Sequence, residues 1–136
     1  MKYYSTNHIA PLASLREAVE QGLAPDRGLY MPQHLNSLPT SFFKHIDDMS
    51  FQELSFEVAH ALFGEDVDET DLRHIVYDTL SFETPVVKVK DNIHALELFH
   101  GPTLAFKDVG ARFMARLLQY FIQKNHTSSP ASSSQV

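Results

Sequence analysis

The chain contains no cysteine and no tryptophan, and it has only five glycines in 136 residues. Without cysteine, a disulfide scaffold, a thiol nucleophile and a sulfur-ligated metal cluster are all excluded. No apolar stretch is long enough to cross a bilayer, and the start of the chain lacks the apolar run of a secretory signal, so we expect no membrane partner and a cytoplasmic location. The hydrophobic content of 43%, with ten phenylalanines, suffices for a globular core.

Charge is unevenly distributed along the chain, around a net value of −6. Residues 1–87 carry 5 basic and 14 acidic side chains, whereas residues 88–124 carry 6 basic and 3 acidic ones. The acidic total argues against a nucleic-acid partner. The basic segment suits an anionic ligand such as a phosphate, although a solvated charged surface is the simpler interpretation.

Several common catalytic motifs are missing. None of the eight histidines belongs to a His-Glu-x-x-His pair or another compact ligand spacing, so no metal site is predicted. Residues 101–108 lack the two-glycine spacing and the Lys-Ser or Lys-Thr ending of a P-loop, which argues against nucleotide hydrolysis. No serine lies in a Gly-x-Ser-x-Gly elbow, so nothing points to a Ser-His-Asp hydrolase.

Helix signals dominate the first half of the chain. Capping boxes at residues 14–17 and 50–53 predict helices that end at Gly22 and Gly64. The acidic residues 68–71 begin a third helix, because early carboxylates complement the helix dipole. Its buried stripe consists of Leu72, Ile75, Val76 and Leu80.

Two tight turns are also expected. Residues 25–28 read Pro-Asp-Arg-Gly, which predicts a turn in which Gly28 takes the positive φ. Further along, the hydrophobic period changes to that of strands. Residues 86–90 and 93–98 flank Asp91-Asn92, a pair typical of a two-residue hairpin turn.

The strand that ends at Leu98 leads through a loop into a long helix, a junction where α/β proteins commonly place ligands. We therefore predict an α/β chain with a mostly helical domain at 1–85, followed by the first strand-loop-helix elements of a second domain at 86–125. The serine-rich residues 126–136 are expected to be a disordered tail or linker. One strand-loop-helix unit cannot cover both faces of a parallel sheet, so the second domain is expected to be truncated.

Lys107 stands out because it falls on the apolar side of the long predicted helix. It shares that face with Gly110, Ala111, Met114 and Leu118. The opposite face carries the polar residues Asp108, Arg112, Arg116 and Gln119. Burial of an unpaired ammonium is costly, and a helix N-terminus disfavours a cation, so this placement favours a neutral, nucleophilic amine. A lysine that snorkels to water or pairs with Glu97 explains the pattern about equally well.

Three neighbours of Lys107 carry weaker signals. His100 could hydrogen-bond a ligand, although a role in stabilising the turn is the better interpretation. Thr103 and Asp108 are most simply capping and first-turn residues of the helix, with ligand contact as the minority alternative.

Residues 97–113 read ELFHGPTLAFKDVGARF. This run closely resembles the lysine segment of the threonine synthase family, whose members are pyridoxal-phosphate enzymes of fold type II. Residues 22–32, GLAPDRGLYMP, resemble the N-terminal signature of the same family, so the resemblance spans residues 1 to about 125. It implies that Lys107 forms the Schiff base with pyridoxal 5'-phosphate and that Phe106 contacts this cofactor. It further implies a lyase of threonine biosynthesis that converts O-phospho-L-homoserine and water to L-threonine and phosphate.

One departure from the family pattern limits what the chain is expected to do. The family holds the cofactor phosphate with a Ser-Gly-Asp-Thr-Gly-like loop, and no such loop occurs in these 136 residues. The sequence therefore reads as an N-terminal portion that binds the cofactor poorly and is nearly inactive alone. Another fold-type II enzyme and a non-catalytic interaction module remain as alternatives, and the sequence does not fix the oligomeric state.

Overall fold

A computed structural model describes the chain over residues 1–128, with side chains described up to residue 124. Five α-helices, one 3-10 helix and two small antiparallel sheets make up this part, which confirms the expected α/β class. In chain order the elements are β1 (Tyr3–Ser5), α1 (Leu15–Gln21), β2 (Tyr30–Pro32), α2 (Thr40–Lys44), η1 (Ile46–Asp48), α3 (Phe51–Phe63), α4 (Glu69–Thr79), β3 (Val86–Lys90), β4 (Ile93–Leu96) and α5 (Lys107–Ser128).

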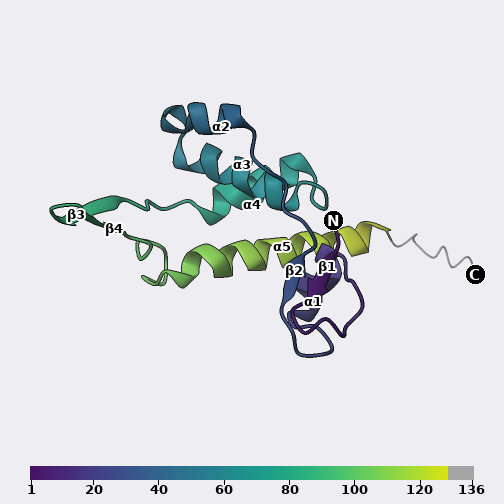
Figure 1. Cartoon of the computed structure of the whole chain (residues 1–136). Coiled ribbons are helices and arrows are strands. Elements are labelled where there is room, and N and C mark those ends of the chain that lie inside the picture. Colours follow the sequence, from purple (N-terminus) through teal and green to yellow (C-terminus); the bar gives the residue numbers. More distant parts are fainter. Residues whose placement is uncertain (129–136) are drawn as a thin grey trace, which may run out of the picture.

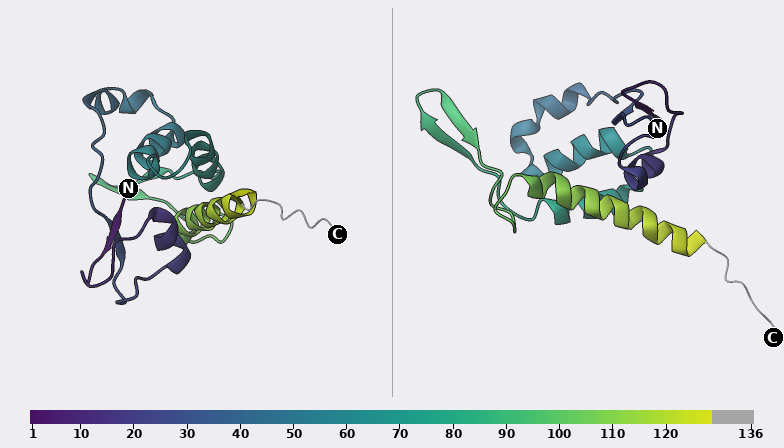
Figure 2. Two further views of the ribbon diagram at one scale, coloured as in Figure 1. Left: turned by 90° about the vertical axis from the view of Figure 1, so that its right-hand side faces the viewer. Right: turned by 90° about the horizontal axis from the view of Figure 1, so that it is seen from below.

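Helix α5 runs along the whole body of the molecule. In Figure 1, α2, α3 and α4 lie on one side of it, and α1 with the β1-β2 sheet lies on the other. The β3-β4 hairpin projects away from this body, as the right-hand view of Figure 2 also shows. A single core joins the parts, with buried side chains from β1, α1, α3, α4 and α5. Within this core, Leu72 of α4 has no exposed surface.

Both predicted capping boxes are formed. The Ser14 hydroxyl accepts a hydrogen bond from the Glu17 main-chain N–H, and the Glu17 carboxylate accepts one from the Ser14 N–H in return. Ser50 and Glu53 make the same exchange at the start of α3. These reciprocal bonds satisfy N–H groups that the first helical turn leaves without partners, so both helices start where the sequence predicts.

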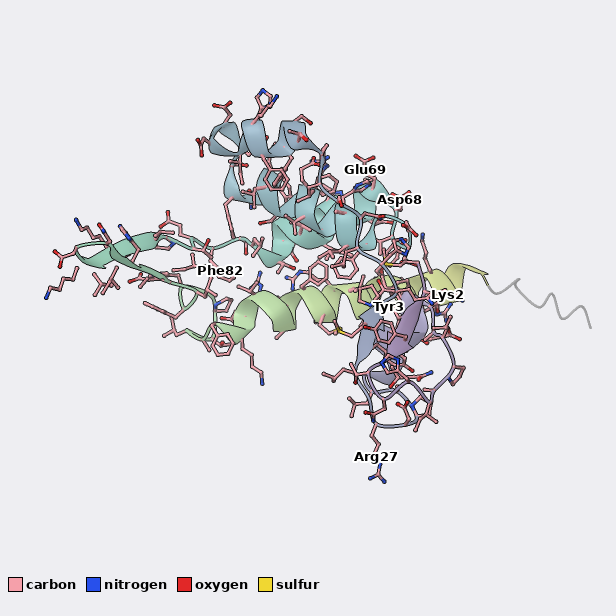
Figure 3. The ribbon with its side chains drawn as sticks, in the orientation of Figure 1. Lys2, Tyr3, Arg27, Asp68, Glu69 and Phe82 are labelled. Carbon is pink, nitrogen blue, oxygen red and sulfur yellow. The ribbon has the colours of Figure 1, made fainter. Side chains whose placement is uncertain are left out.

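The turn at residues 25–28 forms, but the predicted role of Gly28 is wrong. Arg27 takes the left-handed conformation, with φ of 66°, and its side chain points away from the body in Figure 3. Gly28 is required for a different reason, which is space. A Cβ atom on Gly28 would lie 2.0 Å from the Ser5 hydroxyl and 2.9 Å from the Asn7 main-chain nitrogen. The turn therefore needs a glycine for close approach rather than for its backbone freedom.

Asp26 holds the turn at residues 25–28 close to β1 and to the loop after it. Its carboxylate accepts hydrogen bonds from the Ser5 hydroxyl at 2.5 Å and from the main-chain N–H groups of Ile9, Ala10 and Gly28. The Ser5 bond, followed by those from the main chain, holds the pKa of Asp26 far below its usual range. One carboxylate thus fastens the turn to the end of β1 and to the loop that follows it.

The hairpin forms as predicted, with Asp91 in the left-handed region at φ of 44°. Strand β4 ends at Leu96, two residues earlier than expected. Every residue of both strands is exposed, including Val86, Val89 and Ile93, whose exposed fractions exceed 60%. In the described part of the chain the hairpin packs on neither of its faces.

Helix α5 also bears on the expected domain limits. Leu117, Tyr120 and Phe121 belong to the same core as the residues before position 85, so this helix packs on the helical half rather than apart from it. Residues 126–128 are helical, which corrects the expectation of disorder for these three positions. The rest of the expected tail, residues 129–136, lies outside the described part.

Candidate functional site

The candidate site is the junction between the hairpin and α5. After β4, residues 97–106 form a loop of bends and turns, and Lys107 is the first residue of the helix. The side chain of Lys107 is exposed, and Phe106 beside it is 73% exposed. No hydrogen bond or ion pair joins the Lys107 amine to another described side chain. The alternative in which Lys107 pairs with Glu97 is not formed, and the Glu97 carboxylate instead contacts His100 Nε2 at 2.7 Å.

The predicted burial of the Lys107 face is wrong in this structure. The buried side chains of α5 are Asp108, Leu117, Tyr120 and Phe121, with Val109 and Phe113 partly buried. Lys107, Gly110, Ala111 and Met114 are exposed. The helix is apolar on two sides, and helical spacing alone does not reveal which side the helices α1 and α4 will cover. An amine that stays in contact with solvent is the consequence.

Two arginines expected on the solvent face attach α5 to α4. Arg112 Nη2 donates hydrogen bonds to the Asp78 carbonyl at 2.7 Å and to the Ser81 hydroxyl at 3.0 Å. Arg116 Nε donates to the Asp78 carboxylate, which lowers the pKa of Asp78. Figure 3 shows Phe82 on the segment that follows α4, beside α5, and the Arg112 guanidinium lies 5.8 Å from the centre of its ring. Both arginines are thus engaged in holding the helix.

Asp108 is the residue whose importance the sequence understated. It is 5% exposed, and its two carboxylate oxygens accept hydrogen bonds from the Thr103 N–H and the Thr103 hydroxyl, each at 2.8 Å. A Cβ atom on Gly101 would lie 2.5 Å from one of these oxygens. The expected first-turn position of Asp108 is confirmed, but Thr103 is not the predicted cap, because it lies four residues before the start of α5 and donates to Asp108. The five-residue spacing between Thr103 and Asp108 was the one sign in the sequence that these two side chains could bond to each other.

An apolar groove lies next to this junction. It has a volume of about 380 Å³ and runs between α3, α4 and the first turns of α5. Its walls include Leu54, Val58, Val109, Gly110 and Phe113. Gly110 lines this groove and also belongs to the Lys107 face.

The residues around Lys107 fit the aldehyde and ring of pyridoxal phosphate, the cofactor that the resemblance implies. A solvent-accessible primary amine can reach an aldehyde, and the exposed Phe106 and Met114 offer apolar surface to an aromatic ring. The described residues contain no group of three or more histidine, aspartate or glutamate side chains arranged to hold a metal ion. Over the same residues, no helix combines the length and the apolar character needed to span a membrane.

Comparisons with known proteins identify relatives along most of the chain. The family model described as threonine synthase N terminus matches residues 2–80. Threonine synthase of Serratia marcescens is 41% identical over 118 residues, which are 87% of this chain and 28% of that protein. Threonine synthase of Saccharomyces cerevisiae is 36% identical over 140 residues, which are 94% of this chain and 27% of that protein. The chain therefore spans less than a third of the length of these relatives.

Solved structures agree with the sequence relatives. The crystal structure of pyridoxal-phosphate-bound threonine synthase from Brucella melitensis matches with a TM-score of 0.85 and 34% identity, covering 93% of this chain and 28% of that one. Threonine synthase from Escherichia coli matches with a TM-score of 0.83 and 34% identity, covering 90% of this chain and 28% of that one. Both likenesses extend over at least nine tenths of this chain.

Proposed function

Because the chain belongs to the threonine synthase family, we propose that it serves the threonine synthase reaction as part of a pyridoxal-phosphate-dependent lyase, with Lys107 as the residue that holds the cofactor. The observation that carries the proposal is the position of the Lys107 amine. It is exposed at the first residue of α5, where a loop with fixed hydrogen bonds meets the helix. Phe106 offers an apolar contact beside it.

Lys107 Nζ would hold the cofactor by condensing with its aldehyde carbon, with loss of one water. When bound, pyridoxal phosphate supplies an electron sink for charge on the substrate carbons. The amino group of the substrate would take the place of Lys107 on the aldehyde, and the freed Lys107 amine would then accept and return protons close to the reacting carbons. Arg112 and Arg116 hold α5 on α4, so we assign neither of them to a phosphate group.

The proposed substrate is O-phospho-L-homoserine. Phosphate leaves the γ-carbon, which gains one hydrogen, and one hydrogen of the β-carbon is replaced by the hydroxyl of water. The remaining proton of that water goes to the phosphate, so the products are L-threonine and inorganic phosphate. This chemistry moves hydrogen between neighbouring carbons, which a single mobile amine can perform.

We also propose a cytoplasmic location and a small molecule, rather than a nucleic acid, as the partner. The net charge of −6 supports this, since a surface for nucleic acid needs a basic excess.

A non-catalytic interaction module is the second candidate function. The exposure of Met114 and of the hairpin valines favours it, because apolar surface of this kind commonly contacts another protein segment.

Covalent labelling tests the role of Lys107. The purified chain is mixed with pyridoxal phosphate, reduced with borohydride to fix the amine-aldehyde bond, and digested for peptide mapping. We expect Lys107 to be labelled ahead of the five other lysines. Lys107→Arg should remove the main labelled peptide, whereas the matched control Lys90→Arg, on the exposed hairpin, should leave it unchanged. Equal labelling of all surface lysines would favour the interaction module.

A further inference from the structure

The loop before Lys107 is organised around one buried carboxylate. Asp108 Oδ2 accepts the Thr103 N–H and Oδ1 accepts the Thr103 hydroxyl, so a single side chain receives both donors of one residue. These bonds reach back five residues, across the junction between loop and helix. Hydrogen bonds to a charged acceptor are stronger than neutral ones, and little solvent reaches this carboxylate to compete for it.

The loop needs this support because its own conformation is unfavourable. Leu104 is held in the left-handed region at φ of 56°, which residues other than glycine rarely adopt. Gly101 is pressed so closely against Asp108 that a Cβ atom would lie 2.8 Å from the Asp108 Cβ. Meanwhile the Leu104 and Phe106 side chains are more than 70% exposed and add little packing. The carboxylate of Asp108 therefore restrains the loop, together with the main-chain bond from the Leu104 N–H to the Gly101 carbonyl at 3.0 Å.

We infer that Asp108 is a positioning residue for Lys107, because its bonds to Thr103 fix the main chain from which the Lys107 side chain extends. This inference rests on the proposed function of Lys107. No described side chain holds the Lys107 amine, so the direction of that side chain depends on the backbone at positions 106–108. The main-chain N–H of Asp108 bonds the Ala105 carbonyl at 3.1 Å, which couples the carboxylate directly to this backbone.

Three variants separate positioning from a simple effect of charge. Asp108→Asn replaces one carboxylate oxygen with an amide nitrogen, which cannot accept a hydrogen bond from Thr103, and it also removes the charge. Thr103→Val removes one hydrogen bond to the carboxylate but leaves the charge in place. Thr103→Ser keeps both donors and serves as the conservative rescue. Asp91→Asn is the matched control, since it makes the same change at the exposed tip of the hairpin.

The test measures two quantities on the whole chain. One is the initial rate of Lys107 labelling by pyridoxal phosphate and borohydride, normalised to that of Lys90 in the same molecules. The other is hydrogen exchange at the Thr103 amide, which does not depend on the cofactor. We expect Asp108→Asn to slow Lys107 labelling by about tenfold, the effect of one hydrogen bond to a charged group, and to speed the exchange. Thr103→Val should slow labelling severalfold, and Thr103→Ser and Asp91→Asn should change neither quantity.

The outcomes distinguish this inference from the proposed function. If Lys107 is labelled selectively and Asp108→Asn labels just as fast while exchange at Thr103 increases, the positioning role is wrong and the function stands. If Asp108→Asn slows labelling but Thr103→Val does not, the charge of Asp108 acts directly and positioning is again wrong. If the unsubstituted chain shows no preference for Lys107, the function and the inference fall together.

Discussion

Arg112 of α5 donates a hydrogen bond to the main-chain carbonyl of Asp78, close to the end of α4. The same nitrogen donates to the Ser81 hydroxyl, just beyond that helix. A helix leaves its last carbonyl groups without partners and carries partial negative charge at this end, so a guanidinium is well suited to the position. The Arg112 side chain thus caps the C-terminal end of α4 and attaches α5 to it.

Removing this guanidinium should loosen the packing of α5. We expect Arg112→Ala to lower the free energy of unfolding by about 2 kcal/mol, because it removes hydrogen bonds made by a charged donor. Urea denaturation followed by circular dichroism measures the effect. The control is Arg16→Ala, which breaks an exposed pair with Glu20 within α1 and should cost about 0.5 kcal/mol or less. Equal losses in the two variants would contradict the anchoring role.

Two buried tyrosines should respond in opposite ways to loss of the hydroxyl. The Tyr120 hydroxyl accepts from the Asp68 N–H at 3.2 Å and from Lys124 Nζ at 2.5 Å, so Tyr120→Phe should lower the free energy of unfolding by about 1 kcal/mol. The Tyr3 hydroxyl is buried without a hydrogen-bond partner among the described residues. Tyr3→Phe should therefore leave stability unchanged or raise it. Thermal unfolding of the two variants, measured side by side, checks this contrast.

Two glycines offer a similar contrast. Gly28→Ala should destabilise the fold strongly, by about 2 kcal/mol or more, since the new methyl group would collide with Ser5 and with the Asn7 main chain. Gly110→Ala should stabilise α5 by about 0.5–1 kcal/mol, because nothing lies within 4 Å of its Cβ position and alanine favours a helix. Denaturation midpoints test both. A stabilising Gly28→Ala would mean that the turn is looser than the structure indicates.

Acid should weaken the fold through Glu65. Hydrogen bonds from Asn36 and His34, together with the Met1 amine, lower the pKa of Glu65 to about 2. In the unfolded chain this group titrates near its ordinary value of 4.5. Because the folded pKa is the lower one, the stabilisation is complete above about pH 5 and is lost as the pH falls toward 2. Urea midpoints between pH 6 and pH 2 should fall less steeply in Glu65→Gln than in the exposed control Asp47→Asn.

Local signals in the sequence predicted most elements, and tertiary contacts decided the rest. The helices that begin at Leu15 and Phe51 start where their capping boxes require, since a cap depends only on residues within one turn. The hairpin turn at Asp91 is local in the same sense. The shared core of α5 and the helical half could not be predicted this way, because it depends on contacts between residues far apart in the chain.

The site shows the same division. The sequence predicts Lys107 and its loop as the candidate site, and this stays a prediction, whereas it wrongly assigns the exposed side of α5 to the core. Apolar residues occupy two sides of this helix, and only the positions of α1 and α4 determine that Leu117 is buried and Met114 is not. The close contact of Gly101 with Asp108 could not be predicted from the sequence either, because a glycine does not indicate which residue will pack against it.

The projecting hairpin has a consequence for how the chain behaves in solution. Within residues 1–128, β3 and β4 pair only with each other, so the outer edge of each strand presents free backbone donors and acceptors to any extended peptide. A two-stranded ribbon of this kind is only marginally stable in water, and it gains most when a third strand is added. Lys88 and Lys90 place positive charge along one edge, which discourages pairing between identical copies. The β4 edge, which has no lysine, is therefore where strand addition should begin.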